Sequence, residues 1–355
     1  MHKDDQMTSN ERLTAYFEGK EVDRLPAMPM IDSFGCKLSG KPMRYKRQSA
    51  EHQVEIQKAA YDILGLDGLS IEYGLHGIGV ACGTTLTDPE NATPAIAKHC
   101  MEDISEIDNF DPECVRRKND PWMNMCCTAC EMLVDQMGDE VGTSAALTGP
   151  LTILSSMMPI TKLLKAMRKQ PDAVMHALRF ATDALKIICD EFAATGVDIF
   201  ICDPLSSSDI IRPEEYEKMI LPFTQELAPV IHKHEVAMGY HICGNTNPIL
   251  PLQAQTGCDM LSVDAKVPLT YLKEVAGDKM PLIGNIDPIG VMMMGTPADV
   301  RENVLKAIHD AGDSPNGLLV ATGCDIPVTA NVENALAFMD AVREFGPVRL
   351  GMEMK

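Results

Sequence analysis

The 355-residue sequence lacks any apolar run near the about 18 to 20 residues that a membrane-spanning helix needs. This absence excludes a protein built on such helices. The first seven residues are polar and lack the apolar segment of a secretory signal. We therefore expect a cytoplasmic protein.

Basic side chains are scarce. Lys and Arg number 31 against 51 Asp and Glu, which gives a formal net charge of −20. A chain this acidic repels nucleic-acid phosphates and anionic lipids. We therefore expect no nucleic-acid partner and no membrane partner.

The twelve cysteines lack the dense spacing of a small disulfide-rich secreted protein, so reduced thiols or metal ligands are the better interpretation. Cys126, Cys127 and Cys130 include a C-x-x-C pair, but no second pair follows at zinc-ribbon spacing. We interpret these three as thiols on a helix, with contact to a metal or cofactor as the alternative.

Short β-rich runs separated by helix-length segments repeat along the chain, and each indicates a buried strand. The eight runs are Leu25–Ile31, Gly68–Tyr73, Gly142–Thr148, Val197–Asp203, Val236–Cys243, Asp259–Ala265, Pro281–Asp287 and Gly317–Asp325. Parallel strands that alternate with helices favour an α/β fold, a closed (β/α)8 TIM barrel, over an open doubly wound sheet.

Other segments complete the predicted fold. Residues 1–20 contain a capping pattern beginning at Thr8 and predict an N-terminal helix, and residues 50–64 predict an amphipathic helix. Residues 74–139 combine Gly-rich and Pro-rich turns with a charged stretch, which indicates an insertion after the second strand. No linker divides the chain, so we predict a single domain over residues 1–355.

Active sites of (β/α)8 barrels lie at the C-terminal ends of the strands. The predicted strands end in an unusual number of polar residues, which packing alone does not explain. These residues are Asp32, Glu72, Asp203, His241, Cys243, Asp264, Asn285, Asp287, Cys324 and Asp325. We therefore expect the active site at this end of the barrel.

His241 and Cys243 are two residues apart on a predicted strand, so their side chains lie on the same face, and Cys324 ends another strand. Two thiolates and one imidazole suit Zn²⁺, and three protein ligands leave the open coordination position of a catalytic zinc. An isolated His-x-Cys more often has a structural, metal-free role, but placement at two strand ends reverses this preference and favours zinc.

Zinc held by two thiolates and a neutral imidazole is formally neutral, so it is a modest Lewis acid. It still acidifies a bound thiol and so stabilises a nucleophilic thiolate at neutral pH. The ligand set therefore favours alkylation of a thiol over hydrolysis.

Asp203, Asp264 and Asn285 are the candidate catalytic residues. Either aspartate could supply a fourth zinc ligand, accept a proton or support His241, and the alternative is a buried carboxylate that caps the next turn. The Asn285 amide could bind a ligand or simply end a strand in a turn. The candidate substrate-binding residues, at strand ends or just beyond them, are Asn245, Asp287 and Glu72.

Five motifs together resemble the uroporphyrinogen decarboxylase superfamily: IIRPEEYEKMILPF (210–223), HICGNTNPIL (241–250), TGCDMLSVDAKVPL (256–269), LIGNIDPIG (282–290) and ATGCDIP (321–327). The resemblance extends over most of the chain and is densest from 197 to 345. The H-x-C and G-C-D motifs resemble those of the methylcobamide:coenzyme M methyltransferases and related corrinoid-dependent zinc enzymes.

The resemblance implies that zinc held by His241, Cys243 and Cys324 activates a small molecule, and that a methyl group moves between this molecule and the cobalt of a corrinoid. The small molecule would be a thiol similar to coenzyme M, tetrahydrofolate or a methylated donor, and both directions of transfer stay open. The chain lacks a cobalamin-binding D-x-H-x-x-G motif. The resemblance therefore implies a separate small corrinoid-binding protein as partner.

Two alternatives accompany this hypothesis. In the decarboxylases of the superfamily, a histidine resembles the counterpart of Cys324, and an arginine-rich stretch after the first strand binds the tetrapyrrole carboxylates. The corresponding residues 26–35 contain no arginine here, which argues against a uroporphyrinogen decarboxylase-type lyase. The other alternative is a non-catalytic zinc-binding or corrinoid-docking protein.

Overall fold

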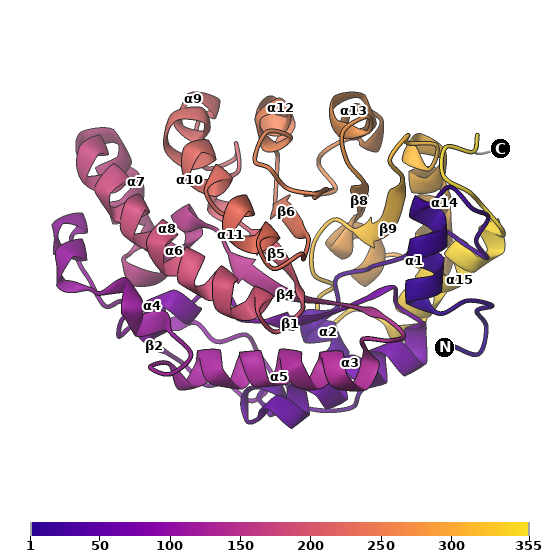
Figure 1. Ribbon diagram of the computed structural model, residues 1–355, viewed down its shortest axis with the longest axis horizontal. Coiled ribbons are helices and arrows are strands. Elements are labelled where there is room, and N and C mark those ends of the chain that lie inside the picture. Colours follow the sequence, from indigo (N-terminus) through magenta and orange to yellow (C-terminus); the bar gives the residue numbers. More distant parts are fainter. Residues whose placement is uncertain (1, 354–355) are drawn as a thin grey trace.

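The computed structural model of the chain describes residues 2–353 and contains a curled, seven-stranded parallel sheet (Figure 1). Its strands follow the order β1-β4-β5-β6-β7-β8-β9, and a separate antiparallel pair is formed by β2 and β3. The strands are β1 Gly68–Glu72, β2 Thr85–Leu86, β3 Ile96–Lys98, β4 Gly142–Thr148, β5 Asp198–Cys202, β6 Met238–Ile242, β7 Met260–Val263, β8 Leu282–Ile286 and β9 Leu318–Thr322.

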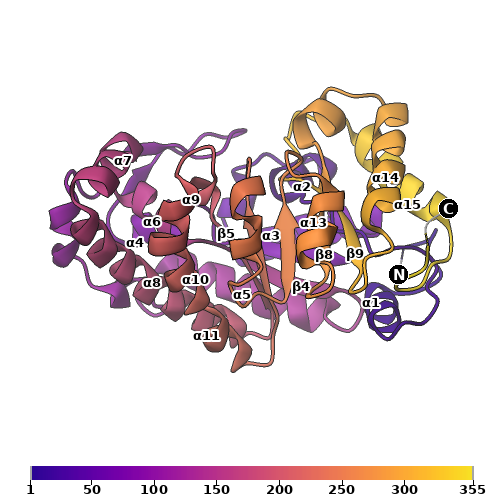
Figure 2. The ribbon, with the colours of Figure 1, turned by 90° about the horizontal axis from the view of Figure 1, so that it is seen from above.

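Helices connect the strands of the large sheet and surround it, as Figures 1 and 2 show. The α-helices are α1 Ser9–Phe17, α2 Asp32–Leu38, α3 Ala50–Leu64, α4 Gly77–Ala81, α5 Pro121–Met137, α6 Pro150–Met157, α7 Ile160–Lys169, α8 Pro171–Ala193, α9 Pro213–Glu215, α10 Leu221–Gln225, α11 Ala228–His232, α12 Leu250–Gln253, α13 Leu269–Ala276, α14 Pro297–Ala311 and α15 Val332–Phe345. The short 3-10 or π-helical turns are η1 Tyr45–Arg47, η2 Ile104–Asn109, η3 Pro112–Val115, η4 Pro204–Ser206, η5 Tyr216–Ile220, η6 Asn247–Ile249 and η7 Pro288–Met293. Within residues 2–353, no helix is both long and apolar enough to cross a membrane.

The predicted α/β fold with a parallel sheet is confirmed, and seven of the eight predicted strands correspond to β1 and β4 to β9. The predicted strand Leu25–Ile31 is wrong as a regular strand. Only Ala27 in this segment pairs, in a single parallel bridge to Val320 of β9. The segment thus lies beside β9 without continuing the sheet as a full ladder.

Proline explains this difference. A parallel ladder needs backbone N–H donors at regular intervals, and Pro26 and Pro29 have none. The backbone hydrogen bonds that remain include those from Met28 N–H to the Val320 carbonyl (2.9 Å), from Val320 N–H to the Pro26 carbonyl (2.8 Å) and from Asp67 N–H to the Ala27 carbonyl (3.0 Å). The apolar run that indicated a strand therefore forms an extended segment between β9 and β1.

Local sequence signals set the ends of α1 and α3. Thr8 and Glu11 form a reciprocal capping box at the start of α1. Helix α3 matches the predicted amphipathic helix: the Ser49 hydroxyl accepts a hydrogen bond from the His52 N–H at its start. The helix ends at Gly65, whose φ of 73° favours glycine.

Residues 74–139 contain α4, the β2–β3 pair, η2, η3 and α5. The cysteines Cys126, Cys127 and Cys130 lie on α5 and are fully buried in the hydrophobic core. Burial raises the pKa of all three thiols. This placement supports our interpretation of these cysteines as thiols on a helix.

A buried network of charged side chains lies at the end of the sheet where β1 begins. Arg12 and Arg24 are each 1% exposed and share the fully buried carboxylate of Asp67, which immediately precedes β1. Arg12 also pairs with Asp23 (2.7 Å) and Arg24 with Asp5 (2.8 Å). Buried charges of this kind are tolerated because each one is paired and hydrogen-bonded.

Candidate metal centre

The three predicted metal ligands lie together at the C-terminal ends of the strands. His241 is on β6, Cys243 follows that strand, and Cys324 follows β9. The Nε2 atom of His241 is 3.3 Å from the Cys243 sulfur, which is 3.5 Å from the Cys324 sulfur. The three ligand atoms lie within 4.8 Å of one another, and no other such group of three occurs in residues 2–353.

These distances fit a tetrahedral zinc site. Zn–S bonds of about 2.3 Å and Zn–N bonds of about 2.0 Å place ligand atoms roughly 3.5 to 3.8 Å apart at the tetrahedral angle. The observed separations of 3.3 and 3.5 Å are close to these values. His241 is 1% exposed, whereas both cysteines are half-buried. The donor set therefore fits zinc with a position left for a further ligand.

Two glycines allow the ligand loops to approach each other. Gly244, directly after Cys243, has a φ of 82°, which a residue with a side chain rarely adopts. At Gly323, a Cβ atom would lie 2.5 Å from the backbone nitrogen of Ala265. The loop that carries Cys324 thus packs directly against the end of β7.

Ser262 orients the imidazole. Its hydroxyl lies 3.0 Å from Nδ1 of His241, which leaves Nε2 facing the two sulfur atoms. Our sequence analysis did not identify Ser262. The parallel register could have found it, because Ser262 on β7 is the direct neighbour of His241 on β6.

The two thiols affect each other's ionisation. A hydrogen bond from the Cys243 thiol, with a smaller contribution from nearby His241, outweighs burial and lowers the pKa of Cys324 to about 4. The same hydrogen bond, together with burial, raises the pKa of Cys243. The pair thus exists most readily with one thiolate and one thiol when no cation is present.

Asp264 and Asn285 fix the backbone around the ligands. One carboxylate oxygen of Asp264 accepts a hydrogen bond from Gly244 N–H (2.8 Å), which holds the turn after Cys243. The Asn285 amide donates to the carbonyls of Asp264 (2.9 Å) and Val267 (2.7 Å). Both side chains therefore stabilise the loops of the centre.

Asp203 is fully buried, and its carboxylate hydrogen-bonds to residues outside the metal-ligand group. Its carboxylate accepts hydrogen bonds from the backbone N–H (3.0 Å) and hydroxyl (2.6 Å) of Thr152 on α6 and from the Ser206 hydroxyl (2.7 Å). Burial raises the pKa of Asp203 in spite of these donors. These contacts match the alternative of a capping carboxylate.

Asp287 and Asn245 also have local partners. Asp287 caps η7 by accepting hydrogen bonds from the N–H groups of Ile289 and Gly290, both at 2.9 Å. The Asn245 side-chain oxygen accepts from the Asn247 amide at 2.8 Å. Neither contact involves the three metal-ligand side chains.

Glu72 belongs to a second charged group at the same ends of the strands. Lys46 pairs with Asp32, and the Ser33 hydroxyl donates to one oxygen of Asp325 (2.7 Å). Burial, then the charge of Asp32, raises the pKa of Glu72 well above its ordinary range and that of Asp325 to about 7. Sequence analysis missed Lys46 and Ser33, because neither lies on a predicted strand.

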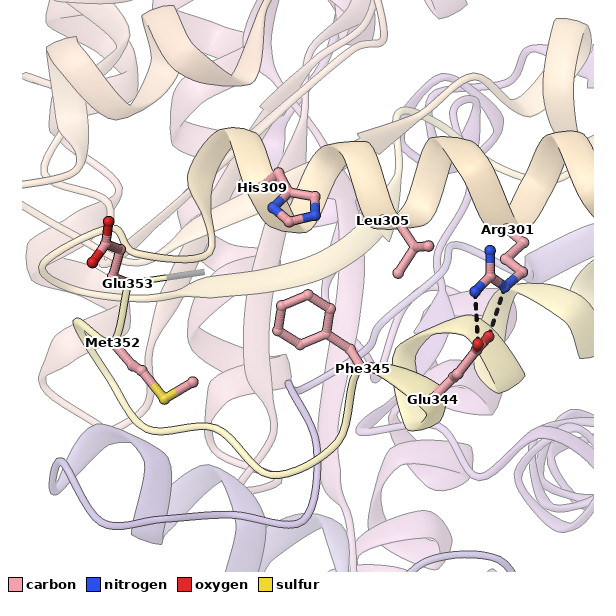
Figure 3. Close-up of a pocket in the computed structure, with 7 residues that line it drawn as sticks. All are labelled: Arg301, Leu305, His309, Glu344, Phe345, Met352 and Glu353. Atoms are coloured by element: carbon pink, nitrogen blue, oxygen red, sulfur yellow. Dashed lines mark hydrogen bonds and ion pairs between the residues drawn. The ribbon is translucent and has the colours of Figure 1, made fainter. Parts of the chain in front are cut away.

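Figure 3 shows a pocket of about 680 Å³ lined by Arg301, Leu305, His309, Glu344, Phe345, Met352 and Glu353. Its strongest polar groups are already paired, since Arg301 binds Glu344 through two hydrogen bonds of 2.6 Å. None of the lining residues ends a strand or belongs to the metal-ligand group. The pocket is therefore distinct from the candidate centre.

Comparison with proteins of known function finds relatives that align with nearly the whole chain. The chain is 26% identical over 334 residues to the methylcobamide:CoM methyltransferase MtbA of Methanosarcina mazei, covering 90% of this chain and 93% of the relative. It is 30% identical over 349 residues to a methylated-thiol–coenzyme M methyltransferase of the same organism, covering 96% and 90%. A uroporphyrinogen decarboxylase of Aliivibrio salmonicida is 23% identical over 256 residues, 69% of either chain.

A solved methyltransferase structure from Methanosarcina mazei matches 96% of this chain and 99% of its own length, with a TM-score of 0.82 and 24% identity. This likeness establishes the fold. The profile of the family described as uroporphyrinogen decarboxylase (URO-D) matches residues 8–345. The resemblance inferred from the sequence motifs is confirmed, and the relatives support methyl transfer as the general activity. The chain belongs to the uroporphyrinogen decarboxylase (URO-D) family.

Proposed function

We propose that the chain is a zinc-dependent methyltransferase that moves a methyl group between a corrinoid on a partner protein and a zinc-activated small molecule. The observation that carries this proposal is the group of His241, Cys243 and Cys324, whose ligand atoms lie within 4.8 Å of one another. The relatives named as methylcobamide:CoM methyltransferases support the transfer chemistry.

Each ligand has a defined role in this proposal. The two cysteines and Nε2 of His241 would hold the metal, and the Nδ1–H of His241 would donate to Ser262 so that the correct nitrogen faces the site. Bound zinc supplies positive charge that acidifies a substrate thiol at neutral pH. The imidazole would be shielded from bulk water, since His241 is 1% exposed.

A thiol similar to coenzyme M is the substrate that the relatives favour over tetrahydrofolate or a methylated donor, because several of them are named for coenzyme M. The chain has no D-x-H-x-x-G motif of its own. We therefore place the corrinoid on a separate small protein that docks at the C-terminal ends of the strands.

The remaining candidate residues have supporting roles. We propose that Asp264 and Asn285 position the ligand loops, and that Asp203 positions α6. Glu72, Asn245 and Asp287 would contact the substrate at the edge of the centre.

We further propose that the sheet is a (β/α)8 barrel in which residues 25–31 take the place of the eighth strand. In this interpretation the N-terminal helix packs beside the barrel, residues 74–139 form an insertion after the second strand, and residues 1–355 form a single domain. The curled parallel order of the seven strands supports it.

The test combines metal analysis with an activity assay. We expect about one zinc ion per chain and loss of the methylcobalamin spectrum when coenzyme M is added. Cys324→Ser should lower the zinc content and reduce the rate by more than about 100-fold, because a ligand is lost. Cys100→Ser is the matched control, since Cys100 is a half-buried thiol outside the ligand group.

Three outcomes would contradict the proposal. Full activity of a zinc-free, chelator-treated protein would show that the reaction does not need the metal. Unchanged activity of Cys324→Ser would favour a docking protein. Metal-independent decarboxylation of uroporphyrinogen would favour the lyase.

A further inference from the structure

A second pair of cysteines lies outside the candidate metal centre. The sulfur atoms of Cys82 and Cys114 are 3.5 Å apart, and both residues are half-buried free thiols. Cys82 directly follows α4, and Cys114 lies on η3. The pair therefore joins two segments that are distant in sequence, both within residues 74–139.

The surroundings of this pair differ from those of the metal ligands. Cys243 and Cys324 have the same sulfur–sulfur distance of 3.5 Å, but His241 lies beside them as a third ligand. Within residues 2–353, no other group of three suitable side chains exists. Two thiols without a third ligand make a poor zinc site, because zinc sites in proteins use three or four protein ligands.

The backbones of both cysteines are held in place. Gly79 on α4 packs so closely on α6 that a Cβ atom would lie 2.7 Å from the Ser156 carbonyl oxygen. Cys114 N–H donates to the carbonyl of Asp111, whose side chain caps η3. A disulfide needs the sulfur atoms to approach from 3.5 Å to about 2.05 Å, which side-chain rotation can supply.

We propose that Cys82 and Cys114 form a reversible disulfide by exchange with a small disulfide such as oxidised glutathione. The Cys114 thiolate attacks one sulfur of the small disulfide, breaks its S–S bond and releases one glutathione. The Cys82 thiolate then attacks the mixed disulfide on Cys114 and releases the second glutathione. Two electrons pass from the protein thiols to the small disulfide, and the two thiol protons end on the released glutathiones.

The local ionisation is compatible with this order. A hydrogen bond from the Cys82 thiol to Cys114 lowers the pKa of Cys114, and the same bond raises the pKa of Cys82. The thiolate is the attacking form in disulfide exchange. Cys114 is therefore the first nucleophile, and Cys82 completes the bond.

The disulfide would tie α4 to η3. Helix α4 begins five residues after the end of β1, close in sequence to Glu72. The oxidised form would thus restrain a segment that follows a strand of the large sheet. This inference is independent of the proposed methyl transfer.

The experiment uses the full zinc-supplemented chain in buffers of rising oxidised-to-reduced glutathione ratio, followed by acid quenching, alkylation and peptide mass spectrometry. We expect a cross-linked peptide pair containing Cys82 and Cys114, lost again on addition of dithiothreitol. Cys82→Ser should instead retain glutathione on Cys114. Cys100→Ser should still form the cross-link, since its thiol is not one of the pair.

Two results would overturn the proposal. One is complete alkylation of Cys82 and Cys114 at the highest proportion of oxidised glutathione. The other is a cross-link that joins either residue to a different cysteine, such as Cys100, in preference to its partner. The assay reads thiol state directly, so its failure leaves the proposed activity untouched.

Discussion

At the scale of single residues, the candidate centre depends on side chains that do not touch the metal. The Ser262 hydroxyl selects which imidazole nitrogen of His241 faces the sulfur atoms, and the Asp264 carboxylate holds the turn after Cys243. Such outer partners commonly change metal affinity by about 10- to 100-fold when they are removed. The ligands alone therefore do not define the site.

Ser262→Ala removes the side-chain partner of Nδ1 in His241 while leaving all three ligands in place. We expect zinc affinity to fall by about 10-fold or more, because the imidazole loses the contact that fixes its orientation. Competition with a chromophoric chelator measures this change.

Ser70→Ala is the matched control for this change. Ser70 is also on a strand, but its hydroxyl has no hydrogen-bond partner among the described residues. An equal loss of affinity in both variants would show that the effect is general destabilisation of the sheet.

At the scale of elements, the loop after β9 can reach the other ligands because Gly323 has no side chain. A Cβ atom there would lie 2.5 Å from the Ala265 backbone nitrogen, closer than real Cβ contacts allow. Gly323→Ala should lower the free energy of unfolding of the zinc-loaded protein by about 1 to 3 kcal/mol and weaken zinc binding, because the loop must shift. Denaturant unfolding and zinc titration measure the two effects.

Gly142→Ala on β4 is the control for the loop variant. Its new Cβ atom would meet nothing nearer than 3.7 Å. If Gly323→Ala bound zinc as tightly as Gly142→Ala, the close approach at residue 323 would have no role in forming the centre.

The sequence predicted elements well where one local signal dominates. Buried strands have apolar runs, and the two-residue spacing of His241 and Cys243 follows from strand geometry. The segment Leu25–Ile31 has the same apolar character, but its prolines prevent a ladder. The role of Asp203 could not be predicted from the sequence, because its hydrogen bond with Thr152 forms only when β5 and α6 pack together.

At the scale of the whole molecule, stability depends partly on the buried network of Arg12, Arg24, Asp67 and Asp5. This network lies at the end of the sheet away from the candidate metal centre. Burial raises the pKa of Asp5, but hydrogen bonds and charge from Arg24 and Arg343 outweigh it and lower this pKa to about 2. A carboxylate with a lowered folded-state pKa stabilises the protein fully above its unfolded value of about 3.8. That contribution, about 2 kcal/mol, is lost as the pH falls through about 2.

Asp5→Asn should therefore reduce the pH dependence of the free energy of unfolding between about pH 4 and pH 2. Urea unfolding of the metal-free protein at several pH values measures it, since metal loss at low pH then has no effect. Asp4→Asn is the control: the Asp4 side chain is 53% exposed and lies outside the network. Parallel pH curves for wild type and Asp5→Asn would rule out this role of Asp5.

The extended segment 25–31 lies between β9 and β1 without forming a regular ladder with either strand. A few backbone hydrogen bonds hold it, including those from Met28 to Val320 and from Asp67 to Ala27, whereas β8 and β9 pair over five residues. Local opening is cheapest where fewest such bonds must break. Amide hydrogen exchange at Met28 should therefore be faster than exchange within β6, and local opening would occur beside Asp32 and Cys324, next to the candidate metal centre.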